Sequence, residues 1–288
     1  MRAHWAGALA VAVGMGACAG PPPASEALPE GAVVIARFGE ARALGSDGAG
    51  RLYVADAARS VVAVLDTAGT PVRRLGGTDE LAFLDVADVD PTNGQAVFVA
   101  DAGTGRVVRF TAEGRAAETL DVPDLAALDR FDARDGAAPG RPVAVAAGPG
   151  NEVYVLDAER KHVLRWTASR QLDRVLGSAG AAASETRLSA PTALAVTDAG
   201  SVVVVDGARA VVYGALGGLE GTTPAGELAR LVNVSASDRG VLYVGAGGVR
   251  EDDGPVRAVA VGEALVDATR SGAFLYVLTR TRLIRLPG

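Results

Sequence analysis

Short apolar segments followed by aspartate recur along the chain. Four copies consist of four apolar residues and an Asp, and two later copies lack the Asp. The six copies are Leu52–Asp56, Val97–Asp101, Val153–Asp157, Val202–Asp206, Leu242–Ala246 and Leu275–Thr279. Runs rich in β-branched residues and bounded by Gly and Asp are typical of strands and turns. The pattern therefore predicts an all-β protein built from one repeated unit.

The sequence around each copy repeats as well. An apolar segment and a Gly-containing turn precede each copy, and another apolar segment follows most of them. In several units a further segment ends in Gly, as in Pro71–Gly76 and Leu172–Gly177. Each unit is long enough for one four-stranded sheet, and the chain contains six such units.

One of these units identifies a family. The segment Val97–Phe110 resembles the NHL repeat, and Val153–Trp166 shows the same order of apolar, Asp, polar and apolar positions. The resemblance covers residues 32–288 and implies a six-bladed β-propeller. The last unit has three predicted strands, ending with Arg282–Leu286. The early segment Val33–Gly39 ends like the fourth strands of other units, so we expect it to close the last blade and remove an exposed edge.

The first residues predict export. A positive start, a short apolar stretch and small residues are the parts of a secretory signal. Met15–Cys18 resembles the lipobox of bacterial lipoproteins, which implies lipidation of Cys18. We therefore expect a signal peptide at 1–17, a Pro-rich tether at 18–31 and the propeller at 32–288. Together, the signal, the tether and the propeller predict a monomer that a lipid anchors at the bacterial outer membrane or cell envelope. We expect the propeller to lie in the periplasm or at the cell surface.

Composition narrows the function. The 288 residues include 28 Lys and Arg against 34 Asp and Glu, which offers no basic field for nucleic acid. Of two histidines, His4 lies in the predicted signal, which leaves His162. Six-bladed amidating lyases, arylesterase-lactonases and streptogramin lyases resemble one another in using histidines, and one histidine cannot supply such a cluster. Gluconolactonase-like enzymes instead hold a divalent metal through carboxylates and amides.

Several polar residues are candidates for metal ligands or for caps of turns. Asn151, Asp206 and the region of Asn233 are candidates for a gluconolactonase-like metal site, but they match no motif. The repeated aspartates could form a ring of metal ligands, but we expect them to cap turns instead. These aspartates are Asp56, Asp101, Asp157 and Asp206. An Arg three residues later could fold over the same turn, at Arg59, Arg160 and Arg209.

Insertions are candidates for contacts, because function often lies on loops carried by a rigid scaffold. The longest insertion, 123–141, carries a set of charged residues around one aromatic residue. The candidate partner contacts are Asp129, Arg130, Phe131, Asp132 and Arg134. The alternative is a loop without a role.

The sequence therefore predicts a lipid-anchored propeller that binds or scaffolds an envelope protein or a small ligand. We expect no catalytic residues, cofactor or metal. The alternative is a metal-dependent lactonase-like or lyase-like hydrolase, in which a divalent metal would take part. A sensor domain with a small ligand in its channel is a further alternative.

Overall fold

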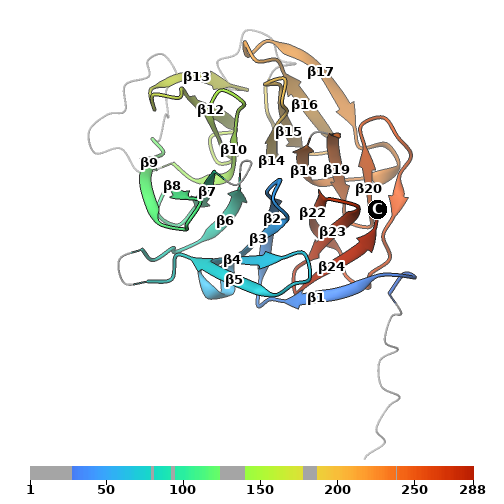
Figure 1. The fold of residues 1–288 in the computed structure, drawn as a ribbon. Helices are drawn as coiled ribbons and strands as arrows, with labels where there is room; N and C mark the ends of the chain where they lie inside the picture. Colours follow the sequence, from blue (N-terminus) through green and yellow to red (C-terminus); the bar gives the residue numbers. More distant parts are fainter. Residues whose placement is uncertain (1–27, 79–80, 92–94, 124–139, 178–186, 238) are drawn as a thin grey trace, which may run out of the picture.

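The computed structural model describes residues 28–78, 81–91, 95–123, 140–177, 187–237 and 239–288. These residues form six antiparallel sheets of four strands, arranged around a central axis (Figure 1). The predicted fold class, an all-β six-bladed propeller, is confirmed. In the described residues, helical structure is limited to short 3₁₀ turns, and no helix has the length and apolar character needed to cross a membrane.

Each blade runs from an innermost strand at the axis to an outermost strand at the rim. Blades 1 to 3 are, in this direction, β2 (Ala41–Ser46), β3 (Arg51–Asp56), β4 (Val61–Asp66), β5 (Pro71–Leu75); β6 (Val86–Asp90), β7 (Ala96–Asp101), β8 (Arg106–Thr111), β9 (Ala116–Asp121); and β10 (Pro142–Ala147), β11 (Val153–Asp157), β12 (His162–Trp166), β13 (Leu172–Leu176). Blades 4 to 6 are β14 (Pro191–Val196), β15 (Val202–Asp206), β16 (Arg209–Tyr213), β17 (Leu219–Pro224); β18 (Leu231–Ser237), β19 (Gly240–Gly245), β20 (Gly248–Glu251), β21 (Arg257–Ala258); and β22 (Leu265–Ser271), β23 (Phe274–Thr279), β24 (Arg282–Pro287), β1 (Val33–Arg37).

The sixth blade joins the two ends of the described chain. Strand β1 pairs antiparallel with β24, with Val33 opposite Arg285 and Val34 opposite Ile284. Figure 1 shows the two strands side by side at the rim. Ile284 is fully buried at this junction. The N-terminal strand therefore closes the ring, as the repeat pattern predicted.

The core lies between the blades. The described residues contain six apolar clusters, and each cluster combines side chains from two neighbouring blades. For example, Tyr53 of blade 1 packs in one cluster with Val86 of blade 2. Most members are Val, Ala and Leu, which fit between closely stacked sheets. Burial of this apolar surface is the main force that holds the ring together.

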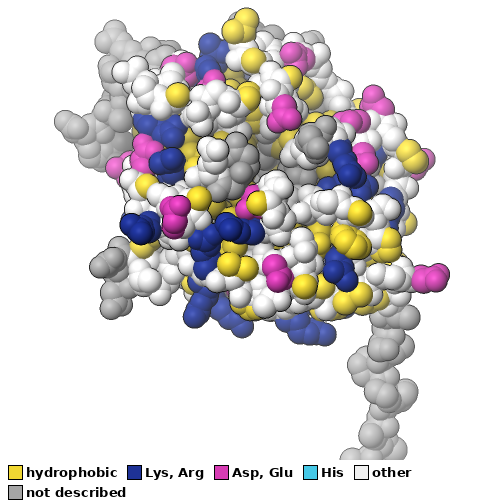
Figure 2. All heavy atoms as spheres, in the orientation of Figure 1, with side chains coloured by type: hydrophobic (Ala, Val, Ile, Leu, Met, Phe, Trp, Pro, Cys, Tyr) yellow, Lys and Arg dark blue, Asp and Glu magenta, His cyan; other side chains and the backbone are white. Residues whose placement is uncertain are grey.

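The outermost strands carry charged side chains. In β5 Arg74 is exposed and Arg73 is half-buried, and in β13 Asp173 is exposed. Figure 2 shows basic and acidic side chains interspersed over one face, with basic ones densest near β4 and β5. Charges on an edge strand discourage pairing with a second chain. The outer rim is therefore protected, and the inner edge of each blade faces the axis.

Ring closure gives the first testable prediction. Removing residues 2–38 should uncover Leu283 and Ile284, each of which is fully buried. At roughly 1.5–3 kcal/mol for each buried side chain, the melting temperature should fall by at least about 6 °C. Circular dichroism melting measures the change. The control is a chain lacking only residues 2–27, which should melt like the full chain; equal melting of both truncated chains would show that β1 does not close the ring.

Candidate functional site

The inner strands share one backbone feature. Each has a break in register near its start, as between Ala41 and Ala43 in β2. The residues that follow the break are Ala43, Asp88, Ala144, Ala193, Asn233 and Asp267. We call this the post-bulge position. The backbone N–H of the next residue points toward the axis, away from the neighbouring strand of its own blade, and so needs another acceptor.

Asp267 supplies acceptors at the junction of blades 6 and 1. Its Oδ2 accepts the N–H of Leu44 at 2.7 Å, and its Oδ1 accepts the N–H of Ala268 at 2.7 Å. Asp267 is buried. One carboxylate therefore satisfies inner-strand amides of two blades, the sixth blade, which β1 completes, and blade 1.

Asp88 plays the same part between blades 2 and 3. It accepts the N–H groups of Val89 and Val145, both at 2.8 Å. Two residues after Asp88 in the same strand, Asp90 accepts the N–H of Ala147 at 2.5 Å. In blade 5 the amide oxygen of Asn233 accepts the N–H of Val234 at 2.7 Å. The post-bulge position thus carries a side-chain acceptor in three of the six blades.

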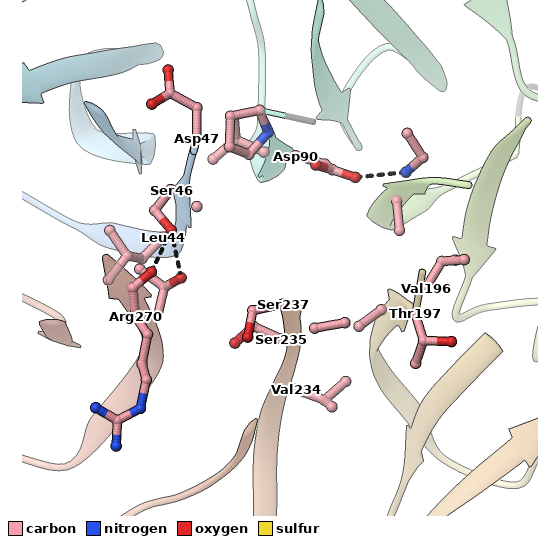
Figure 3. Close-up of a pocket in the computed structure, with 18 of the residues that line it drawn as sticks. Leu44, Ser46, Asp47, Asp90, Val196, Thr197, Val234, Ser235, Ser237 and Arg270 are labelled. Atoms are coloured by element: carbon pink, nitrogen blue, oxygen red, sulfur yellow. Dashed lines mark hydrogen bonds between the residues drawn. The ribbon is translucent and has the colours of Figure 1, made fainter. Parts of the chain in front are cut away.

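A cavity of about 630 Å³ lies on the axis. All six inner strands line it, together with the turns that lead from each inner strand to the second strand of its blade. Figure 3 shows Ser46, Thr197, Ser235 and Ser237 around the opening, and Asp90 bonded to the next strand. Small side chains at Gly45, Ala146, Ala195 and Ala236 leave this space open. The result is a channel with hydroxyl groups at its mouth and carboxylates on its wall.

The channel changes the acidity of its carboxyl groups. Burial raises the pKa of Asp88 to about 7, and the neighbouring Asp90 charge adds to the rise. The N–H groups of Val145 and Val89 oppose it. Burial also raises the pKa of Asp267 well above its usual value, and the charge of Asp88 contributes. A carboxyl group that titrates near neutral pH in a cavity can act as an acid or a base.

The repeated aspartates lie at the other end of the ring. Asp56 is opposite Ala41, the first residue of its inner strand, whereas the cavity opens beyond the last residue. All four accept N–H groups of the segment that leads into the inner strand, such as Glu40 to Asp56 at 3.1 Å and Ala190 to Asp206 at 2.6 Å. The guanidinium groups of Arg59 and Arg209 each pair with their own Asp. The backbone N–H of Arg160 donates to Asp157.

Other predicted site residues lie elsewhere. Cys18 and the candidate contacts at 129–134 fall outside the described residues, so their roles remain predictions. His162 is buried in β12, the third strand of blade 3, and does not line the cavity. The described part of the chain therefore brings no histidine to the channel.

The candidate metal ligands do not come together. Asn151 lies at the mouth and Asn233 on an inner strand, but Asp206 lies at the opposite end of blade 4. Among the described residues, no three His, Cys, Asp or Glu side chains form a group that could hold a metal ion. These donors do not fit the divalent metal site of the gluconolactonase-like hypothesis.

The channel carboxylates are not among the residues that the sequence singled out. Asp88, Asp90 and Asp267 lie inside apolar strands rather than at the conspicuous strand ends. Aligning the six inner strands on their first residue places acidic or amide residues at one shared position. That shared position is the sequence signal by which these residues can be found.

Comparison with known proteins supports the fold. No protein-family model matches the sequence, and no curated protein matches it. Among solved structures, the chain is similar to a streptogramin B lyase, with 12% identity, a TM-score of 0.60, and coverage of 88% of this chain and 96% of that one. It is similar to a gluconolactonase from Xanthomonas campestris, with 13% identity, a TM-score of 0.66 and 89% coverage of each chain.

A third similar structure is a catalytically inactive virginiamycin B lyase from Staphylococcus aureus, solved with quinupristin. The identity is 10%, the TM-score 0.60, and the coverage 89% of this chain and 99% of that one. At such low identity these similarities establish a shared six-bladed propeller. The similar proteins are enzymes, however, which contradicts our expectation of a non-catalytic binding or scaffolding module.

The raised pKa of Asp88 predicts a pH-dependent stability. The folded pKa of about 7 exceeds the unfolded value near 3.9. Between these two pH values, Asp88 keeps a proton in the folded state that it has lost in the unfolded chain. The contribution of Asp88 to the free energy of unfolding is therefore largest below pH about 4, and it is lost as the pH rises through 7. Between pH 5.5 and 8 the parent loses about 2 kcal/mol from this group, so the melting temperature of Asp88→Asn relative to the parent should rise by roughly 4–8 °C.

The matched control for this experiment is Asp66→Asn. Hydrogen bonds from the backbone of Thr70 lower the pKa of Asp66, so this group stays ionised over the same range. The control should keep the pH trend of the parent. A constant difference in melting temperature between Asp88→Asn and the parent at every pH would show that Asp88 does not titrate near 7.

Proposed function

We propose that the protein hydrolyses a lactone or a small ester in its central channel. The observation that carries this proposal is the Asp88 carboxyl group, whose pKa of about 7 places it between its acid and base forms on the wall of a 630 Å³ cavity. A general base is most effective when its pKa lies near the working pH. The similar gluconolactonase structure supports lactones as the substrate class.

The reaction follows from this arrangement. The Asp88 carboxylate takes a proton from a water molecule as the water oxygen attacks the ester carbonyl carbon. The carbonyl π electrons move to the carbonyl oxygen, which becomes an oxyanion. When the carbonyl re-forms, the ester C–O bond breaks, and the leaving alkoxide receives the proton from Asp88. The products are a carboxylic acid and an alcohol, and in a lactone these remain one molecule.

The surroundings of Asp88 support this role. Asp90 lies two residues nearer to the mouth on the same strand, and its charge helps to raise the pKa of Asp88. The N–H groups of Val89 and Val145 hold the Asp88 carboxylate in one orientation. Each of these N–H groups occupies one lone pair of a different Asp88 oxygen, and a second lone pair on each oxygen can take a water proton. Asp88 is therefore both ordered and able to accept a proton.

A lyase reaction is less well supported. The inactive virginiamycin B lyase carries a histidine-to-alanine change. In this chain His162 lies in β12, away from the cavity lining. The carboxylates are the titratable groups with raised pKa values that line the described channel. We therefore favour hydrolysis with a carboxylate base.

Asp88 provides the direct test of the proposed function. With a panel of sugar lactones and simple aliphatic lactones, the parent should show turnover with an apparent pKa near 7. Asp88→Asn should lower kcat/KM by roughly 10²-fold or more, because general-base catalysis typically contributes that much. Asp121→Asn, which alters an exposed carboxylate at the end of β9, is the control and should retain activity. No turnover on any lactone or ester by the parent would reject the proposal.

The poor fit of the channel to a metal ion yields a separate prediction. Activity should survive dialysis against EDTA, because the described carboxylates do not gather around one point. Initial rates before and after dialysis, and after added Ca²⁺, Mg²⁺ or Zn²⁺, measure this. Loss of activity that a divalent ion restores would replace the carboxylate mechanism with the metal-dependent one.

A further inference from the structure

The axis-facing amides of the inner strands form a ring that is capped unevenly. The first members of this ring follow the post-bulge position: Leu44, Val89, Val145, Leu194, Val234 and Ala268. Side-chain oxygens accept the N–H groups of five of them, from Asp88, Asn233 or Asp267. Leu194, in blade 4, is the exception: among the described residues, none provides an acceptor for its N–H.

The exception follows from the sequence. In the capped blades the acceptor sits either on the same inner strand, as Asp88 does for Val89, or on the preceding blade, as Asp88 does for Val145. For Leu194 the corresponding residues are Ala193 and Ala144, and alanine has no side-chain acceptor. Leu194 has the same register as Leu44: it lies opposite Val204, as Leu44 lies opposite Val54. Its N–H therefore faces the cavity, which Leu194 lines.

A second amide lies two residues further along the same strand. Val196 lies opposite Val202 and corresponds to Ala147 of blade 3, whose N–H reaches across to Asp90. The Val196 N–H points to the same side as that of Leu194, because backbone groups alternate along a strand. Blade 2 has Pro91 at this register, which has no N–H to offer. Figure 3 shows Val196 on the channel wall.

We propose that the axis edge of β14 is the oxyanion-binding site of the channel, with the N–H groups of Leu194 and Val196 as its donors. This inference rests on the proposed hydrolysis and identifies where the substrate carbonyl oxygen lies. Backbone N–H groups fixed in a strand stabilise negative charge without reorganising, which is the requirement for an oxyanion hole. The ligand is the carbonyl oxygen of an ester or lactone, and the carboxylate of the product binds the same edge.

The selectivity of this edge follows from charge. Asp90 lies two residues from Asp88 on the inner strand of blade 2, and its charge repels an anionic oxygen from that part of the wall. On blade 4, Ala193 and Ala195 carry no charge beside the N–H groups of β14, which attract the oxygen, and Asp198 of this blade lines the cavity beyond the end of β14. The carbonyl is thereby turned toward β14, and the wall that carries Asp88 remains open for water.

The repeat supplies matched variants for a test. Ala193→Asp should cap the Leu194 N–H in the manner of Asp88 on Val89, and Ala144→Asp should cap it in the manner of Asp88 on Val145. The control, Ala43→Asp, adds the same charge at the same register in blade 1, where Leu44 and Val89 already have acceptors. On the high-pH plateau, where a shift in the pKa of Asp88 has no effect, kcat should fall roughly 10²-fold in the first two variants and little in the control.

A proline variant removes a donor without adding charge. Val196→Pro copies the residue that blade 2 already carries at this register, so no bond to the neighbouring strand is lost. The expected result is a kcat lower by roughly 10²-fold with an unchanged melting temperature. Pro91→Ala, the reverse change in blade 2, should leave kcat unchanged. If Ala193→Asp, Ala144→Asp and Ala43→Asp have equal activity, the inference is overturned.

A binding measurement separates this inference from the proposed function. A δ-lactam, which the protein should hold without turning it over, is titrated by calorimetry into the parent and each variant. Weaker binding by at least about tenfold in Ala193→Asp than in Ala43→Asp supports the β14 edge. Lactam binding that is equal in both variants overturns the inference even if lactones are hydrolysed. Absence of both turnover and lactam binding in the parent overturns the proposed function itself.

Discussion

The inner strand of each blade has one edge with no strand partner. In an ordinary sheet such an edge would pair or face water, but in this ring six of them converge on one axis, where their N–H and C=O groups need partners. The chain meets this constraint with side chains at one repeated register: Asp88, Asn233 and Asp267 accept the exposed amides. The width, polarity and chemistry of the channel follow from how that edge is satisfied.

The same interactions create the reactive group. A carboxylate that binds buried backbone amides must itself be buried, and burial raises the pKa of Asp88 to about 7. The residue thus joins blades 2 and 3, and in the proposed mechanism it is also the group that transfers the proton. Within the described residues, the Leu194 N–H of blade 4 has no side-chain acceptor, because the two acceptor positions carry Ala193 and Ala144. The proposed site is therefore the part of the ring that the protein leaves unsatisfied.

The scaffold was more predictable from the sequence than the site. The repeated apolar segments with their Gly and Asp boundaries, and the family resemblance that they carry, predicted six blades and the closing role of Val33–Gly39, because these depend on short local segments and on their repetition. The channel was missed because Asp88 and Asp267 acquire their role only when inner strands of different blades meet. The scarcity of histidine led to the expectation of a non-catalytic module, which the similarity to enzyme structures contradicts.

A crystal structure with a δ-lactam in the channel tests the central claim most directly, because the lactam resembles a lactone and resists hydrolysis. We predict that its carbonyl oxygen lies within hydrogen-bonding distance of the Leu194 N–H, at roughly 2.7–3.2 Å, with a water molecule on Asp88. A lactam bound at the opposite end of the ring, near Asp56 and Asp206, would contradict the claim. So would a lactam in the channel whose carbonyl oxygen points away from β14.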